Sequence, residues 1–308
     1  METPRSGVSQ QSRAAARRAA PAAEHVRRPD HPWGGRKPGP ARRVRMTRRP
    51  TTMPRVLTFV AAALALAACE RPGPQGDPQA LALIDRAREH HGSALLDRAE
   101  VTFSFRGTPF VLRRDGGRFR YARTTTDSLG RTVEDVVDND GTHRLVDGAE
   151  VPLDAAEAAR TETAVNSVAY FALLPAPLAD PAVRARLLPP DRVGGQAYDR
   201  VGVTFAREGG GADHQDRYVY WLRQSDGRVG HYAYTYRVAP GDTARAATGT
   251  RFRVPLGGRR VGGVLFQDWR NLSADSAGAL EAFGGLHDAG RTFEVSEVVL
   301  DSVRVRPL

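Results

Sequence analysis

The sequence predicts an α+β fold: a curved antiparallel sheet of about ten strands, a half-barrel, with helices covering one face. Three observations support this prediction. Apolar and polar residues alternate in many short segments, as they do in half-buried strands. Turns containing glycine separate neighbouring segments, as antiparallel hairpins require. Two other segments carry apolar residues at three- and four-residue spacing, the period of a helix that packs against a sheet.

The first part of the domain is expected to be a helix followed by about five strands. Ala80, Ile84, Ala87 and His91 recur at helical spacing, and Gly92 is suited to end the helix. The period then changes to two. The expected strands, separated in part by glycine turns at Gly116 and Gly141, are 101–106, 110–114, 118–123, 133–138 and 143–146.

A second helical pattern begins at Asp154, whose carboxylate can cap the helix together with Glu157 in a capping box. Pro175 is expected to end this helix, and a short helix is expected over 181–188. Residues 273–290 are expected to form a helical or loop excursion. About six strands complete the domain, one pair of them joined by a turn at Gly227, and their expected ranges are 201–205, 218–223, 229–237, 251–254, 261–269 and 292–305.

An apolar segment from Val56 to Ala68 follows a basic run and ends in Leu66-Ala67-Ala68-Cys69. This order is typical of a secretory signal, and its ending resembles the lipobox of bacterial lipoproteins. The resemblance implies that Cys69, the only cysteine, takes diacylglycerol and palmitate and begins the mature chain. The alternative is a short transmembrane or core helix, but thirteen residues are too few for the roughly 20 that a bilayer needs.

The expected organisation has four parts: 1–45, a signal peptide over 46–69, a tether over 70–78, and one β-rich domain over 79–308. Residues 1–45 are rich in Arg, Ala and Pro. They are interpreted as an upstream extension, with translation starting at Met46 or Met53, or alternatively as a disordered basic arm. Because Glu70 replaces the aspartate typical of inner-membrane retention, the outer membrane, facing the periplasm, is the favoured location.

The net charge of +10 belongs to the leader. Residues 1–69 hold 14 basic and 3 acidic residues, which leaves 31 basic and 32 acidic residues after Cys69. The exported domain is therefore close to neutral, and a nucleic-acid partner is not expected. The expected partners are the membrane, through the N-terminal lipid, and an amphiphilic small molecule or an envelope protein.

The string from Glu208 to Asp216 is a candidate polar site. Glu208, Asp213, His214 and Asp216 bring carboxylate and imidazole groups within nine residues, around three glycines. The alternative interpretation is a polar hairpin tip whose carboxylates accept from loop amides. The spacing matches no established calcium or zinc ligand set, so no metal or cofactor is predicted, and the structured turn is favoured.

Tyrosines in one expected hairpin form the candidate ligand-binding site. Tyr232, Tyr234 and Tyr236 should share one face of a strand, and Trp221 lies in the neighbouring strand. Aromatic rings with polar tips suit an amphiphile, although ordinary cross-strand packing explains the same pattern. His90 and His91 point in different directions from a helix end and are interpreted as structural.

Several segments together resemble an uncharacterised family of bacterial lipoproteins. They are 166–175, 203–205, 208–216, 220–221, 233–234 and 251–253, and the most specific is Glu-Gly-Gly-Gly-x-Asp-His-x-Asp. The resemblance covers most of residues 78–305 and implies one domain but no catalytic residue. The order of elements also resembles the half-barrel of periplasmic lipoprotein carriers, in which a bent sheet and a helical lid enclose an apolar groove.

These patterns favour a non-enzymatic envelope lipoprotein that binds a lipid or another amphiphile. No catalytic residue is assigned, because no nucleophile elbow, zinc-protease helix or phosphate loop occurs in the sequence. Two alternatives remain open. One is a metal-assisted hydrolase that uses the Glu208–Asp216 loop, and the other is a protein-binding scaffold in envelope assembly.

Overall fold

The structure, a computed structural model, describes residues 73–208, 214–237, 248–275 and 278–308. The chain divides into two units, Met1–Leu66 and Ala67–Leu308, and the described residues all belong to the second. Cys69 and the expected signal peptide lie outside the described residues. Within the described ranges, no helix has both the length and the apolar character that crossing a membrane requires.

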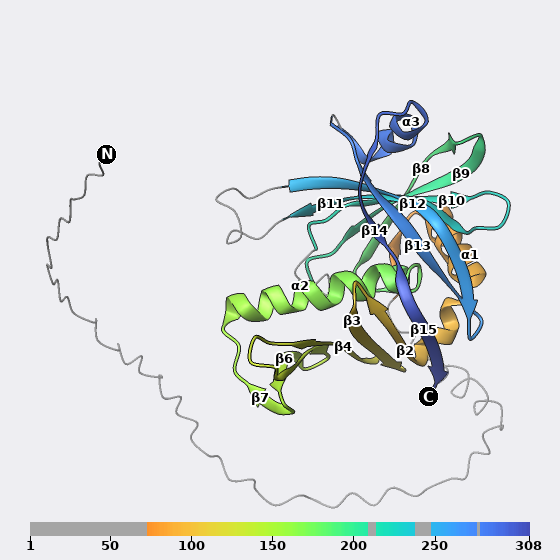
Figure 1. Ribbon diagram of the computed structural model, residues 1–308. Helices are drawn as coiled ribbons and strands as arrows, with labels where there is room; N and C mark the ends of the chain where they lie inside the picture. The colour runs from red at the N-terminus through yellow and green to blue at the C-terminus, as the bar shows by residue number, and fades with distance from the viewer. Residues whose placement is uncertain (1–72, 209–213, 238–247, 276–277) are drawn as a thin grey trace, which may run out of the picture. The chain divides into compact units, whose positions relative to one another are not determined.

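The described residues form fifteen strands, three α-helices and three short 3-10 helices (Figure 1). The strands are β1 (Gln75–Gly76), β2 (Arg98–Phe105), β3 (Thr108–Asp115), β4 (Arg118–Thr126), β5 (Thr132–Asp138), β6 (Gly141–Val146), β7 (Ala149–Val151), β8 (Val183–Val193), β9 (Gln196–Phe205), β10 (Tyr218–Arg223), β11 (Val229–Arg237), β12 (Thr248–Val261), β13 (Val264–Ser273), β14 (Phe293–Val298) and β15 (Leu300–Pro307). The helices are α1 (Pro78–His91), α2 (Ala155–Ala172) and α3 (Phe283–Asp288), with η1 (Ser93–Asp97), η2 (Ala176–Ala179) and η3 (Leu280–Ala282).

The strands are divided between two sheets. The large sheet has the order β1-β8-β9-β10-β11-β12-β13-β14, and the small sheet has the order β15-β2-β3-β4-β5-β6-β7. Every pairing is antiparallel except that of β1 with β8. The prediction of an α+β fold rich in antiparallel strands is confirmed. The prediction of a single sheet of about ten strands is wrong, because strands β2 to β7 pair with one another and with β15, whereas β8 to β14 pair with one another in a separate sheet.

The two long helices carry local capping residues, and the predicted ones, Gly92 at the end of α1 and the capping box of α2, form. Asp77 accepts from the backbone amide of Gln79 at the start of α1, and Gly92 ends this helix with a left-handed φ of 71°. Asp154 and Glu157 form the expected capping box at the start of α2. These local signals succeed because each needs only residues within one turn of the helix end.

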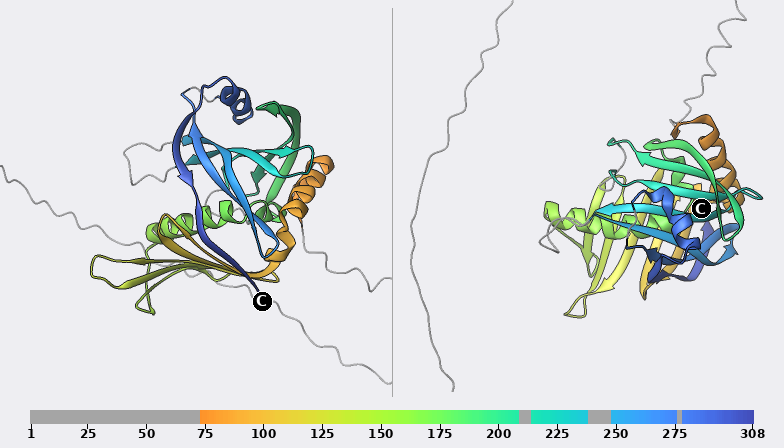
Figure 2. Two further views of the ribbon diagram at one scale, coloured as in Figure 1. Left: turned by 45° about the vertical axis from the view of Figure 1, so that its right-hand side comes forward. Right: turned by 90° about the horizontal axis from the view of Figure 1, so that it is seen from above.

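Helix α2 lies between the two sheets (Figures 1 and 2). Its Val168, Ala169 and Ala172 join a buried cluster with the small sheet, while Tyr170 packs against the cluster of the large sheet. Helix α1 packs on that same face of the large sheet. Phe283 of α3 belongs to a third cluster, on the opposite face. The helices therefore cover both faces of the large sheet, and the expectation of a single covered face is wrong.

Other differences from the predicted elements occur where pairing overrides local pattern. Residues 181–188 were expected to be helical, but β8 runs from Val183 and pairs with β9. The segment 261–269 contains a hairpin turn at Gly262-Gly263 that joins β12 to β13. The expected strand 292–305 is two strands, β14 in the large sheet and β15 in the small one, so the chain passes from one sheet to the other here (Figure 2).

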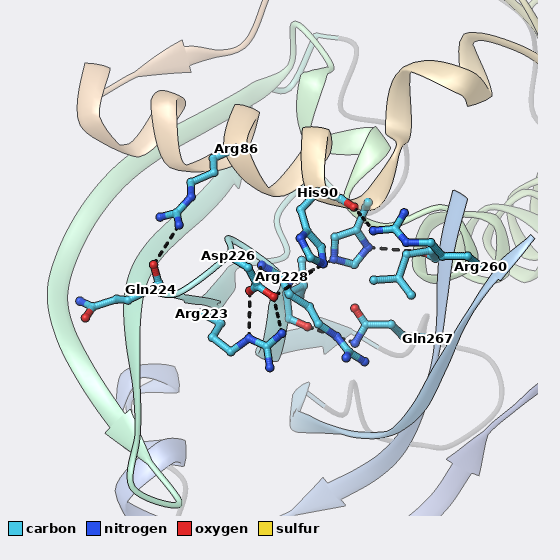
Figure 3. A network of polar contacts seen from close by, with 11 residues as sticks. Arg86, His90, Arg223, Gln224, Asp226, Arg228, Arg260 and Gln267 are labelled. Atoms are coloured by element: carbon cyan, nitrogen blue, oxygen red, sulfur yellow. Dashed lines mark hydrogen bonds and ion pairs between the residues drawn. The ribbon is translucent and has the colours of Figure 1, made fainter. Parts of the chain in front are cut away.

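A polar network joins the end of α1 to the β10–β11 hairpin (Figure 3). Arg86 donates to the carbonyl of Gln224, and Nε2 of His90 lies 3.9 Å from a carboxylate oxygen of Asp226. His91 is buried, accepting at Nε2 from the amide of Val229 at 3.2 Å, with Nδ1 3.4 Å from the carbonyl of Leu265. The two histidines have different partners, which agrees with a structural role for the pair.

Candidate ligand-binding site

Five tyrosines on the large sheet form a continuous set of neighbouring rings, which we name the tyrosine ladder; four of them stack, and the Tyr236 ring is tilted at 54° to that of Tyr234. The register pairs Tyr218 with Tyr234 and Tyr220 with Tyr232, and Tyr236 follows along β11. The ring centroids of Tyr218 and Tyr234 are 5.4 Å apart, and those of Tyr220 and Tyr232 are 5.8 Å apart. All five side chains thus share one face, and the alternation predicted for Tyr232, Tyr234 and Tyr236 is confirmed.

The ladder passes from half-buried rings into the core. Tyr234 and Tyr236 are half-buried, whereas Tyr232 is 1% exposed and Tyr220 is 0% exposed. Tyr170 of α2 covers the inner end, with its hydroxyl 2.8 Å from that of Tyr220. The packing interpretation is therefore right for the two inner tyrosines, and only the outer rings can contact a ligand without a rearrangement.

Trp221 does not belong to this site. As the residue after Tyr220 in β10, it faces the other side of the sheet, where its ring packs against Phe252 and its indole N–H donates to Asp191 at 2.9 Å. Neighbouring residues of a strand point to opposite faces, and the core around α3 covers Trp221 completely. Trp221 is therefore buried on the opposite face from the tyrosines and cannot line the same site, contrary to the prediction.

Arg253 of β12 extends the inner end of the ladder. It pairs in register with Tyr232 on one side and with Asn271 on the other, and only 6% of it is exposed. Its Nη2 donates to the hydroxyl of Tyr234 at 2.9 Å. The guanidinium lies over two rings, 5.7 Å from the centroid of Phe171 in α2 and 5.6 Å from that of Tyr234.

The guanidinium of Arg253 is incompletely bonded. Its Nε and Nη1 are buried without a hydrogen-bond partner, and within the described residues no carboxylate forms an ion pair with it. Three nearby groups in the same buried region also lack a partner, namely the Tyr232 hydroxyl, the Trp269 indole N–H and the Asn271 amide oxygen. The Tyr232 and Trp269 rings are in edge contact at 5.0 Å. A buried positive charge without a counter-ion is costly, so this cluster is suited to an anionic group.

Burial keeps the inner tyrosines protonated. Desolvation raises the pKa of Tyr220 well above its ordinary value. The same cause raises the pKa of Tyr232, against the opposing effect of Arg253. Both hydroxyls therefore carry their proton; that of Tyr220 contacts the Tyr170 hydroxyl, and that of Tyr232 has no partner.

The candidate polar loop is only partly described. Residues 209–213, which include Asp213, lie outside the described residues, while Glu208 is exposed, His214 is half-buried and Asp216 is 7% exposed. Within the described ranges, no three His, Cys, Asp or Glu side chains come close enough together to hold a metal ion. The choice between a structured turn and a polar site at this loop stays a prediction.

Two hollows open elsewhere on the described surface. One, of about 210 Å³, is lined mainly by arginines of the small sheet and residues of α2. The other, of about 260 Å³, is lined by Tyr198, Arg223, Arg228 and part of β12. Both are below the ~300–1,000 Å³ typical of small-molecule sites. Neither includes a residue of the tyrosine ladder.

Arg253 was missed as a site residue because its sequence context is ordinary. Arg251 and Arg253 alternate with Phe252 and Val254, which predicts two arginines pointing to solvent. Two tertiary contacts distinguish them: Phe171 of α2 lies over Arg253, and β13 pairs with Arg253, so that Arg253 is buried while Arg251 is half-buried. The one available signal was the position of Arg253 on a strand next to the tyrosines.

The chain belongs to a family of unknown function, DUF6503, whose model matches residues 94–299. This agrees with the expected resemblance to an uncharacterised family. Comparison with proteins of curated function finds no match.

Solved structures with a similar arrangement include a DUF1329 family protein from Desulfovibrio piger and the lipoprotein LppX from Mycobacterium tuberculosis. The first is 10% identical, with 73% of this chain and 92% of that chain covered and a TM-score of 0.32. The second is 14% identical, with 51% and 88% covered and a TM-score of 0.24. Both similarities are too distant to assign a function.

Proposed function

We propose that this protein is a non-enzymatic, membrane-anchored envelope lipoprotein that binds an amphiphile at the tyrosine ladder. The single observation that carries the proposal is the gradient of burial along β11, from half-buried Tyr236 to Tyr232 at 1% exposure. Rings with apolar bodies and polar tips provide contacts for a chain and hydrogen bonds for its head group. Lipidation of Cys69 and a location at the outer membrane facing the periplasm are part of the same proposal.

The outer rings offer the first contact for such a ligand. Tyr234 and Tyr236 have ring centroids 6.4 Å apart. A saturated chain that covers these rings removes apolar surface from water, at about 25 cal/mol per Å². The rest of the ligand can reach the inner rings only if α2 moves away from the ladder, because Tyr170 of α2 contacts Tyr218 and Tyr220.

Native mass spectrometry of the full-length protein, purified from expressing cells in a non-ionic detergent, tests this proposal. We expect a mature mass that begins at Cys69 and includes a diacylglyceryl group, together with a non-covalent adduct of lipid mass. Tyr236→Ala should reduce the adduct, whereas Tyr121→Ala, a half-buried tyrosine of β4 in the small sheet, should not. A wild-type protein without any lipid adduct, before or after incubation with amphiphiles, would refute amphiphile binding.

A protein-binding scaffold is a second candidate, which one observation favours. Strand β14 ends the large sheet and pairs only with β13 among the described strands. Its Phe293 and Val295 are 49% and 45% exposed. An edge strand with exposed apolar side chains is a template for an added strand. A Phe293→Lys, Val295→Lys variant that keeps its lipid adduct but loses cross-linked envelope proteins would support this role.

A further inference from the structure

We infer that Arg253 binds the anionic head group, a carboxylate or a phosphate, of the amphiphile that the tyrosine ladder receives. This inference rests on the proposed function, and it assigns a ligand class that the tyrosines alone do not specify. The position of Arg253 supports it first. Arg253 lies at the inner end of the ladder, where it pairs in register with Tyr232 and its guanidinium packs against the ring of Phe171.

The hydrogen bonds of Arg253 leave a defined set of free donors. Nη2 is fixed by the Tyr234 hydroxyl, which leaves Nε and Nη1 buried without partners. Guanidinium nitrogens form paired bonds with the two oxygens of a carboxylate or phosphate. The unpartnered Tyr232 hydroxyl and Trp269 indole N–H are further donors in the same region, and neither carries a charge.

The missing counter-ion of Arg253 also favours an anionic ligand. Elsewhere in the chain a buried charge has counter-ions, since Asp135, whose side chain is 2% exposed, is bound by the half-buried Arg123 and Arg144 at distances of 2.8 and 2.7 Å. Within the described residues Arg253 has no such partner, and its surroundings are three aromatic side chains and an amide. Water or the Asn271 amide oxygen can satisfy a donor but cannot neutralise the charge, whereas an anionic head group does both.

The neighbouring Arg251 provides a matched control. It lies two residues away on the same strand and the same face, over Tyr236, and donates to the carbonyl of Thr250. It differs from Arg253 in being half-buried, so water already solvates it. A general electrostatic attraction for anions would depend on both arginines, and a built head-group site would depend only on Arg253.

The test compares head groups on one chain length. Full-length protein in non-ionic detergent is incubated with laurate, lauryl phosphate or dodecanol, and retained adducts are counted by native mass spectrometry. Inorganic phosphate alone is the fourth probe, and it distinguishes a free anion from a lipid head group. The wild type should retain laurate or lauryl phosphate at least about tenfold better than dodecanol, as expected when charge-assisted hydrogen bonds are added. This comparison needs no variant.

Variants then locate the preference. Arg253→Met should abolish the preference for an anionic head, Arg253→Lys should retain part of it, and Arg251→Met should leave it unchanged. Equal retention of laurate and dodecanol by the wild type would overturn the inference while the proposed function stands. Equal losses of the head-group preference in Arg251→Met and Arg253→Met would also overturn the inference and leave the proposed function standing. Arg253-dependent binding of inorganic phosphate without any retained amphiphile would instead support the anion site and refute the proposed function. No binding of any probe would refute both.

Discussion

Two buried histidines, His91 and His231, should make the fold sensitive to acid. Desolvation by burial lowers the pKa of His91 to about 3 and the pKa of His231 to about 4. Below about pH 6.5 the unfolded chain therefore binds protons at both positions that the folded chain does not bind. The free energy of unfolding must fall as the pH is lowered through this range.

The linkage relation sets the magnitude. Each of these histidines costs about 2 kcal/mol at pH 5, because the unfolded state is then protonated and the folded state is not. Together they should lower the free energy of unfolding by about 4 kcal/mol between pH 8 and pH 5. Asp226 does not add to this loss. The hydrogen bond from Arg223 lowers its pKa to about 2, so its contribution is lost only below about pH 4.

Urea unfolding of the full chain at both pH values, followed by tryptophan fluorescence, measures the effect. Glutamine at position 91 can still accept from Val229 and donate to Leu265, so His91→Gln should remove the contribution of His91, about 2 kcal/mol of the pH-dependent loss. His143→Gln is the comparison with the opposite sign: His143 is partly exposed and a hydrogen bond to Glu150 raises its pKa, so this variant should not reduce the loss of stability on acidification. A stability that does not change between pH 8 and pH 5, or an equal loss in His91→Gln, would show that the reasoning is wrong.

Two further predictions concern packing and backbone conformation. Phe103→Ala should lower the free energy of unfolding by about 3–5 kcal/mol, since the ring is 4% exposed. Tyr236→Ala should lower the free energy of unfolding clearly less in the same urea assay, because its ring is half-buried. An equal loss would show that Tyr236 is a core residue. Gly92→Ala should cost more than the ~1–2 kcal/mol of a left-handed residue, since the added Cβ would lie 2.6 Å from the carbonyl oxygen of Gly263. Gly107→Ala is the control, because Gly107 has a φ of 78° and open space around it, so its substitution measures only the cost of the left-handed backbone. Equal losses of unfolding free energy in the two variants would show that the contact with Gly263 costs nothing.

Features set by neighbouring residues could be predicted from the sequence. The capping box of α2 needs only Asp154 and Glu157, and the end of α1 needs only Gly92, and both form as expected. Gly116, Gly141 and Gly227 have the positive φ that their turns require. The shared face of the ladder follows from the two-residue period of a strand, and pairing of β10 with β11 adds Tyr218 and Tyr220 to it.

Pairing between distant strands decided what the local pattern could not. Residues 183–188 were expected to be helical although Arg184 and Arg186 alternate with Val183 and Ala185, and pairing with β9 makes this segment a strand. The division into two sheets depends on β15, which leaves β14 and returns to pair with β2 almost 200 residues earlier in the chain.

By itself, the sequence determined the helix ends, the hairpin turns and the alternation that places tyrosines on one face, because each depends on residues a few positions apart. The tertiary structure alone decided which of these residues are buried. Trp221 and Arg253 show this most clearly. The core around α3 encloses the first on the opposite face, and α2 covers the second beside the ladder. Burial depends on which surface another element covers, and that element is distant in the sequence.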